Sequence, residues 1–115
     1  MNTAYFYLTD EGGKLAHKLA AAHPGDIYNK ENFKENLRAG FGRYDSLVCI
    51  MATGIVVRIL APLIVHKTSD PAVVVLDQKG KYAISLLSGH LGGANDLVKW
   101  LSFPVAKLSS LPQPM

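Results

Sequence analysis

Ala72-Val73-Val74-Val75-Leu76 decides the fold class, because an unbroken apolar run rich in β-branched residues is typical of a strand buried on both faces of a sheet. The polar segment Asp77-Gln78-Lys79-Gly80 follows it, and a second apolar run then extends from Tyr82 to Leu86. We therefore predict a hairpin whose second strand is antiparallel to the first. Asp77 is interpreted most simply as an acid of the hairpin turn.

Two further apolar runs, Ala4 to Leu8 and Ser46 to Met51, predict buried strands, and Ile27-Tyr28 predicts a short additional one. Helical patterns lie between and after these strands. Thr9-Asp10 can cap a helix whose apolar stripe includes Leu15 and Leu19. The spacing of Phe33, Leu37 and Phe41 predicts a second helix. A third is predicted from Gly54 to Pro62, with Thr53 as its cap. A fourth is predicted with Ser88 as its cap, from the spacing of Leu91, Ala94, Leu97, Val98 and Leu101.

Strands that alternate with helices favour an α/β fold with helices on both faces of the sheet. We predict a three-layer α/β/α arrangement with a mostly parallel, mixed sheet of about five strands, including the hairpin. Residues 1–101 are expected to form one domain. Residues 102–115 contain three prolines and no periodicity, and are expected to form an irregular tail.

The composition excludes several classes of protein. Twelve Lys and Arg against nine Asp and Glu give a mild net charge of +3 without a basic cluster, which favours an anionic small molecule over nucleic acid. No apolar run is long enough to span a membrane, and the first residues lack a signal-peptide pattern. The single cysteine, Cys49, lies in an apolar run and is interpreted as a core residue. A cytoplasmic location follows as the expectation.

Candidate binding residues lie in the loops after Leu8, Met51 and Leu87, because ligands of open α/β sheets bind beyond the carboxyl ends of the strands. The three loops are therefore expected at one edge of the sheet, where the second and third converge into a single cationic pocket. Thr9 belongs to the first loop. In the second, Thr53 and Gly54 offer a hydroxyl and helix-terminal amides to an anion, and Arg58 is expected to reach back over Gly54. The alternative is that Thr53 only caps the helix and Arg58 pairs with an acid.

The third loop is the most informative, because three glycines surround a histidine between Ser88 and Asn95. Gly89, Gly92 and Gly93 would let a flat ligand approach the backbone closely. His90 is then placed to move a proton near neutral pH, with Asn95 as an orienting amide. The alternative for His90 is a capping residue bonded to a backbone carbonyl. Lys67 is a further cationic candidate, although its simpler interpretation is a solvated loop residue.

Other types of site are poorly supported. No His or Cys pair has the spacing of zinc ligands, and no phosphate-binding or dinucleotide-binding glycine motif is present. Ser88 does not stand in a nucleophile elbow. The remaining histidines, His17, His23 and His66, are expected to be solvated.

Three segments together resemble the amino-terminal domain of the CbiG family of cobalt-precorrin-5A hydrolases. The match extends from about Phe41 to Leu97, and residues 1–40 agree only in their pattern of elements. The segments are Met51-Ala52-Thr53-Gly54-Ile55 with Val57-Arg58 and Ala61-Pro62, then Lys67 with Asp70-Pro71-Ala72-Val73-Val74, Asp77 and Gly80, and finally Ile84 to Asn95.

The resemblance implies opening of the δ-lactone of cobalt-precorrin-5A and release of acetaldehyde to give cobalt-precorrin-5B, in anaerobic cobalamin biosynthesis. No separate cofactor is expected, since the substrate carries the cobalt. His90 and Ser88 are the catalytic candidates. The substrate is a polycarboxylate, which suits Arg58 and Lys67. His90 is expected to act as a base toward water, to assist the carbon-carbon cleavage, or to bind the cobalt as an axial ligand.

The resemblance ends after Trp100, where relatives continue into a central region and a carboxyl-terminal domain. That missing domain and other enzymes of the cobalamin pathway are the expected partners, and a homodimer is left open. Two alternatives are a non-catalytic tetrapyrrole-binding or assembly module and a general anion-binding domain.

Overall fold

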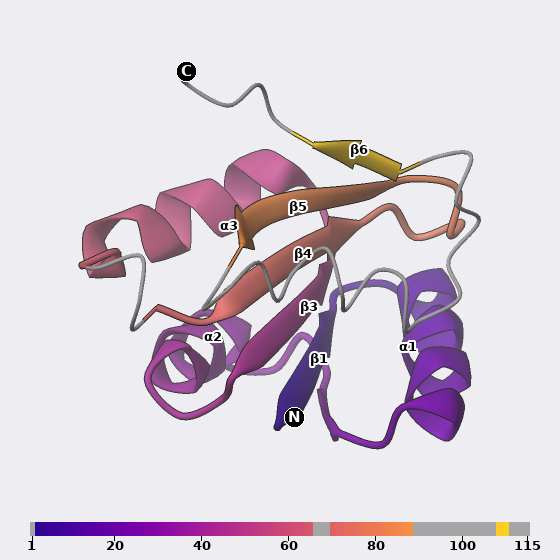
Figure 1. The fold of residues 1–115 in the computed structure, drawn as a ribbon. Helices are drawn as coiled ribbons and strands as arrows, with labels where there is room; N and C mark the ends of the chain where they lie inside the picture. The colour runs from indigo at the N-terminus through magenta and orange to yellow at the C-terminus, as the bar shows by residue number, and fades with distance from the viewer. Residues whose placement is uncertain (1, 66–69, 89–107, 111–115) are drawn as a thin grey trace.

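The structure, a computed structural model, describes residues 2–65, 70–88 and 108–110 (Figure 1). Strands and helices alternate through most of this range, as the sequence predicts. In chain order the elements are β1 (Thr3–Tyr7), α1 (Asp10–Ala22), β2 (Asp26–Tyr28), α2 (Phe33–Phe41), β3 (Ser46–Ile50), α3 (Thr53–Leu60), the 3-10 helix η1 (Ala61–Leu63), β4 (Ala72–Leu76), β5 (Ala83–Ser88) and β6 (Leu108–Ser110).

The strands form one six-stranded sheet in the order β2-β1-β3-β4-β5-β6. Strands β1 to β4 are mutually parallel, with β1 between β2 and β3. Strand β5 is antiparallel to β4, and β6 is parallel to β5. The mixed, mostly parallel sheet with its hairpin is therefore confirmed, and β6 is an addition to the strands that the sequence predicts.

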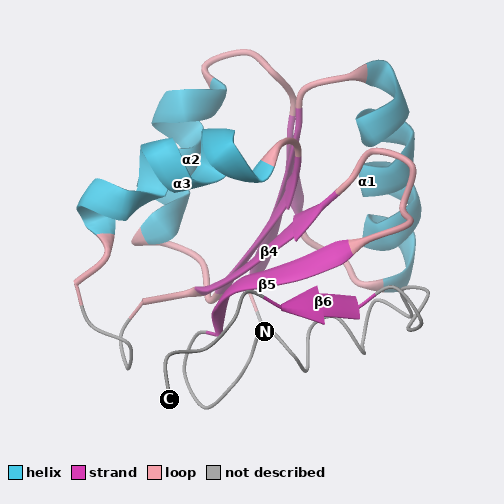
Figure 2. Cartoon of the chain, turned by 90° about the horizontal axis from the view of Figure 1, so that it is seen from above, coloured by secondary structure: helices cyan, strands magenta, loops and turns pink. Residues whose placement is uncertain are grey.

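Helices cover both faces of the sheet, with α1 on one face and α2 and α3 on the other (Figure 2). Alternate strand residues point to opposite faces, so that each strand contributes to two cores. The core beneath α1 contains Tyr5, Val48 and Val74, and the core beneath α2 and α3 contains Phe6, Cys49 and Val75. The three-layer α/β/α prediction is confirmed.

The hairpin is closed by the turn that the sequence predicts. Asp77 Oδ1 accepts hydrogen bonds from the amides of Lys81 at 2.8 Å and Tyr82 at 2.6 Å. Gly80 has φ +72°, in the left-handed region where a side chain would be strained. The interpretation of Asp77 as a turn acid is confirmed.

Two details differ from the sequence predictions. Helix α3 begins at Thr53, and Ala52 takes the N-cap position without a side-chain cap bond, so the prediction of Thr53 as the cap is wrong. The helix starts one residue early because Ala52 O accepts the first amide bonds, from Ile55 at 3.1 Å and Val56 at 3.4 Å.

The three residues of β6 lie in the segment expected to be irregular, so that expectation is wrong for them. The helix predicted from Leu91 to Leu101 lies outside the described residues.

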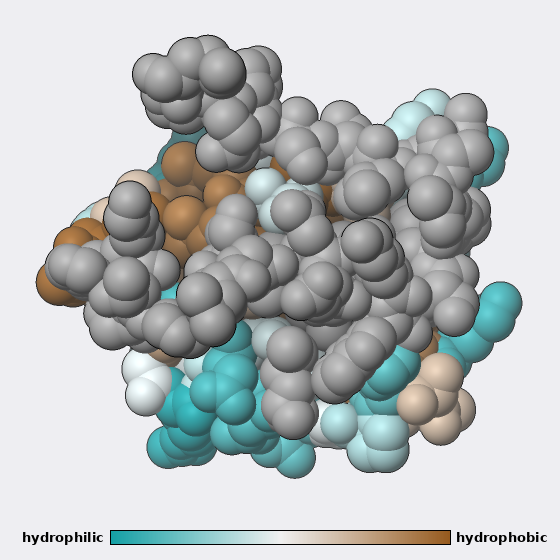
Figure 3. All heavy atoms as spheres, viewed as in Figure 1, coloured by the Kyte–Doolittle hydropathy of each residue, from teal (hydrophilic) through white to brown (hydrophobic). Residues whose placement is uncertain are grey.

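An apolar surface lies along α3 and beyond its end. Figure 3 shows hydrophobic residues in brown at the upper left, on the side where Figure 1 places α3. Three large aliphatic side chains are exposed there, Val57 at 43%, Ile64 at 48% and Val65 at 83%. Surfaces of this kind mark sites of interaction in soluble proteins.

Candidate functional site

The loops that follow the parallel strands meet at one edge of the sheet. The strand register places Tyr7 beside Ile50, and Ile50 beside Leu76. Strand β1 pairs with β2 on one side and with β3 on the other, so the order of the strands reverses between β1 and β3. In open α/β sheets such a switch point forms a crevice, here between the loop after β1 and the loop after β3.

A cavity of about 350 Å³ lies at the switch point, and we call it the central cavity. Residues from the loop after β1, the loop after β3 and the hairpin turn form its walls. Its apolar lining is made by Leu8, Ile50, Met51, Ala52 and Ile55, and its polar lining by Thr9, Asp77 and Gln78.

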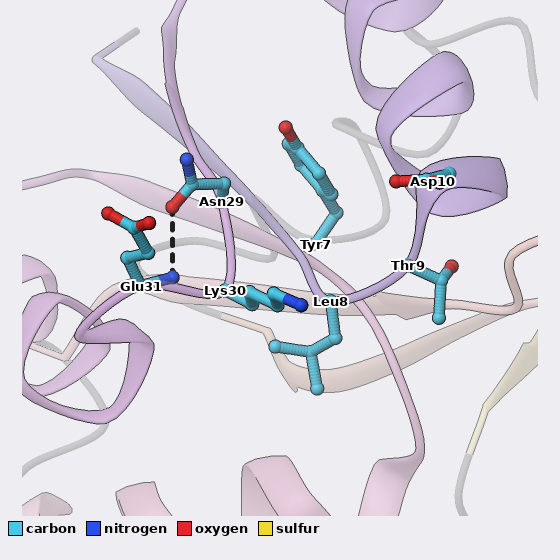
Figure 4. Close-up of a pocket in the computed structure, with 7 residues that line it drawn as sticks. All are labelled: Tyr7, Leu8, Thr9, Asp10, Asn29, Lys30 and Glu31. Carbon is cyan, nitrogen blue, oxygen red and sulfur yellow. Dashed lines mark hydrogen bonds between the residues drawn. The ribbon is translucent and has the colours of Figure 1, made fainter.

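Two smaller cavities flank the central one along the same edge. The hairpin cavity, of about 180 Å³, shares Met51, Ala52 and Asp77 with the central cavity and adds Thr53 and Tyr82. The β2 cavity, of about 210 Å³, shares Leu8 and Thr9 with it. The polar residues that complete the β2 cavity are Tyr7, Asp10, Asn29, Lys30 and Glu31 (Figure 4).

Thr9 joins two walls of the central cavity. Its Oγ1 accepts the Gly12 amide at 3.0 Å as the N-cap of α1, and its hydroxyl donates to Gln78 Oε1 at 2.8 Å. The predicted cap is therefore confirmed. Gly12 and Gly13 let α1 start close to the sheet, because a Cβ at Gly13 would lie 2.7 Å from Tyr7 Cε2. Local sequence thus fixes the position of Thr9 at the cavity.

The second loop brings only part of its predicted set to these cavities. Thr53 lines the hairpin cavity. Gly54 is exposed, and a Cβ there would meet nothing within 4 Å. Arg58 is exposed and lines none of the three cavities, so the prediction that it reaches the anion site over Gly54 has no support from the geometry.

The third predicted loop does not begin at this edge. Strand β5 runs against β4, so that its last residue, Ser88, pairs with Ala72, the first residue of β4. The chain therefore leaves β5 at the edge where the parallel strands begin, and the prediction that the loops after Leu8, Met51 and Leu87 share one edge is wrong. Six predicted site residues lie outside the described residues, namely Lys67, Gly89, His90, Gly92, Gly93 and Asn95. Ser88 is described only as the last residue of β5.

Sequence reasoning missed two functional candidates at the cavities. Lys30 extends toward Leu8 in Figure 4, from the loop after β2. Asn29 Oδ1 holds that loop by accepting the Glu31 amide at 2.9 Å. The second is Gln78, which the sequence pattern predicts only as a residue of the hairpin turn. The sequence could have indicated both Lys30 and Gln78, because each follows the carboxyl end of a parallel strand.

Two other predictions concern single residues. Cys49 is fully buried, and burial raises the pKa of its thiol to about 12. His17 is exposed, as expected, and its Nδ1 lies 2.8 Å from Gly13 O.

Among the described residues, no group of three or more His, Cys, Asp or Glu side chains could hold a metal ion. None of the described helices has the length and apolarity to cross a bilayer.

Comparisons with known proteins agree with this architecture. Residues 35–106 match the family model described as Cobalamin synthesis G N-terminal. The cobalt-precorrin-5A hydrolase of Salmonella typhimurium is 46% identical over 111 residues, covering 86% of this chain and 32% of the relative. The cobalt-precorrin-5A hydrolase of Priestia megaterium is 52% identical over 59 residues, covering 51% of this chain and 16% of the relative.

A solved structure has the same fold. The cobalamin biosynthesis protein G homologue from Sulfolobus solfataricus aligns with a TM-score of 0.77 at 25% identity, over 97% of this chain and 36% of that chain. This chain thus spans about a third of the length of the Salmonella relative. The family match covers most of the chain and includes strands β3, β4 and β5, and therefore the hairpin. The chain belongs to the family of Cobalamin synthesis G N-terminal domains.

Proposed function

We propose that this chain is the amino-terminal part of a cobalt-precorrin-5A hydrolase, which opens the δ-lactone and releases acetaldehyde to give cobalt-precorrin-5B. Relatives at 46% and 52% identity carry that name. The observation that carries the proposal is the central cavity, which lies at the switch point of the sheet. In this fold that position is where ligands bind.

The chemistry of the three cavities supports a flat substrate that bears carboxylates. The central cavity offers an apolar surface from Leu8, Met51 and Ile55 to a macrocycle. Lys30 supplies a cation at the β2 end. At the other end Thr53 lines the hairpin cavity, and the Thr53 and Gly54 amides that open α3 donate to no protein carbonyl within the described residues. Helix-terminal amides suit a carboxylate.

The remaining part of the full-length relatives is proposed as the partner of this domain. The chain spans 32% of the Salmonella hydrolase, so most of the catalytic protein lies beyond the aligned part. The exposed side chains of Val57, Ile64 and Val65 offer an apolar surface for such a contact. In this proposal the substrate brings its own cobalt, and the reaction takes place in the cytoplasm.

His90 stays a proposed catalytic residue, either as the axial ligand of the cobalt or in the carbon-carbon cleavage that releases acetaldehyde. The variant His90→Gln separates these roles. A changed cobalt absorption spectrum on binding supports the ligand role. An unchanged spectrum with lost acetaldehyde release supports the proton-transfer role.

Acetaldehyde release from cobalt-precorrin-5A tests the proposed function. The chain is assayed alone, mixed with the remaining two thirds of the Salmonella relative, and fused to it. We expect acetaldehyde from the mixture or the fusion in excess of either part alone. Corrinoid binding without acetaldehyde in all three samples would instead identify a non-catalytic binding module. Binding of inorganic phosphate in preference to the corrinoid would identify a general anion-binding domain.

A further inference from the structure

We propose that Asp77 and Gln78 form the pair that activates water and orients the lactone carbonyl in the central cavity. The inference rests on the proposed function and assigns the first chemical step to residues of the hairpin turn. It also moves that step away from His90, whose loop starts at the opposite edge of the sheet.

Asp77 is placed between two cavities. It lines both the central cavity and the hairpin cavity, and it is the only carboxylate among the described residues that line either one. Every other residue lining both cavities is apolar, namely Met51 and Ala52. A water molecule that enters this apolar space therefore finds Asp77 as its strongest proton acceptor.

The two oxygens of Asp77 have different surroundings. Oδ1 is held by the amides of Lys81 at 2.8 Å and Tyr82 at 2.6 Å, which fixes the carboxylate in the turn. Oδ2 receives no hydrogen bond from any described residue, in contrast to Oδ1. The turn uses only the Oδ1 oxygen of Asp77, so Oδ2 is available to a bound molecule. Preorganisation of this kind is what a general base requires.

Gln78 is oriented by its neighbour. Thr9 Oγ1 already accepts the Gly12 amide at 3.0 Å, and its own proton points to Gln78 Oε1 at 2.8 Å. With Oε1 engaged by Thr9, the Nε2 group of Gln78 keeps both of its hydrogens for other acceptors. No described residue takes either of them. An amide donor beside a carboxylate suits a carbonyl that gains negative charge as water attacks it.

The proposed step balances as an ester hydrolysis. Asp77 Oδ2 takes a proton from water as the water oxygen forms a bond to the lactone carbonyl carbon. The Gln78 amide stabilises the oxyanion, and the bond from the carbonyl carbon to the ring oxygen then breaks. The departing alkoxide takes the proton back from Asp77, which leaves a free carboxyl group and a hydroxyl group.

The variant Asp77→Asn separates catalysis from the turn. Its side-chain oxygen still accepts the amides of Lys81 and Tyr82, so the hairpin keeps its bonds while the base is lost. Gln78→Glu likewise keeps an oxygen for the Thr9 hydroxyl and removes the amide donor. Asp45→Asn is the matched control, because Asp45 Oδ2 accepts the Asn2 amide at 3.1 Å at the opposite edge and lines none of the three cavities.

Steady-state kinetics of the active mixture or fusion provide the test. For Asp77→Asn we expect kcat to fall by about 100-fold or more, with KM within a few fold. For Gln78→Glu we expect a loss of roughly 100-fold in kcat. Asp45→Asn keeps both kcat and KM.

Three outcomes are distinguishable. An active parent with an inactive, folded Asp77→Asn variant supports both the proposed function and the pair. An active parent whose Asp77→Asn variant keeps its kcat overturns the pair and leaves the proposed function standing. A parent that releases no acetaldehyde in any sample overturns the proposed function and the inference with it.

Discussion

Cys49 is the fourth of the five residues of β3 and has no exposed surface, and ionisation of its thiol affects stability at high pH. Burial raises its pKa from 9.0 to about 12, because the folded protein disfavours the charged thiolate. As the pH rises, the thiol therefore ionises in the unfolded chain at a lower pH than in the folded protein. Stability from this group is therefore complete below about pH 9 and is lost as the pH rises from 9 toward 12.

We expect the free energy of unfolding to fall by ~2 kcal/mol through this group between pH 8 and pH 10.5. Urea unfolding at the two pH values measures the change. The Cys49→Ala variant, which is less stable at both values because it loses packing, should show a smaller loss with pH. Equal losses in the two proteins would assign the alkaline sensitivity to other groups. Tyr44 is one, since burial and its bond to Asp26 raise its pKa.

Lys30 is the cation that the structure adds to the candidate site. The Lys30→Gln variant should bind cobalt-precorrin-5A up to about 5-fold more weakly, since an exposed ion pair contributes about 0.2–1 kcal/mol. Its affinity should also depend less on salt. Absorption titrations at two salt concentrations measure both effects. Lys79→Gln is the control, because Lys79 lies in the hairpin turn and lines none of the three cavities.

At the scale of the elements, two helices begin with glycines that have different reasons to be there. In α1, a Cβ at Gly13 would lie 2.7 Å from the Tyr7 ring, so packing requires the glycine. In α3, a Cβ at Gly54 would meet nothing within 4 Å. The position of α1 against the sheet therefore depends on its glycine, and that of α3 does not.

Alanine substitutions at these two positions should act in opposite directions. Gly54→Ala should raise the free energy of unfolding by up to about 1 kcal/mol, through helix propensity and a less flexible unfolded chain. Gly13→Ala should lower it by roughly 1–3 kcal/mol, because the Tyr7 ring must move. Urea midpoints measure both changes. Corrinoid affinity is the second readout, since a stabilised Gly54→Ala protein with unchanged affinity would remove Gly54 from the proposed site.

At the scale of the whole molecule, the direction of β5 decides which segments belong to the site. Its six residues span about 17 Å at ~3.3 Å per residue, with Ala83 beside Leu76 and Ser88 beside Ala72. The loop that carries His90 therefore begins about one strand length from the central cavity. The carboxyl-edge rule applies to parallel strands, and the predicted hairpin already implied that the loop after Leu87 leaves from the other edge.

Pairs of spin labels test this arrangement. A label at Ser88 should lie closer to one at Asp45, at the edge where the parallel strands start, than to one at Lys79, in the hairpin turn. Asp45 O accepts the amide of Ala72 at 2.9 Å, which places it near the end of β5. Dipolar broadening in electron paramagnetic resonance spectra measures the two separations. The reverse order would contradict the antiparallel register, and cysteine labelling leaves the buried Cys49 thiol unmodified.

The sequence by itself determined the local structure. Unbroken runs such as Val73-Val74-Val75 predict buried strands, Asp77 and Gly80 predict the turn, and Thr9 predicts the cap of α1, because these signals depend on neighbours along the chain. Only the tertiary structure decided the strand order and the edge at which each loop lies, because strand pairing is set by contacts between distant residues. The central cavity and the pairing of Thr9 with Gln78 depend on those contacts, and so does the proposed role of Asp77.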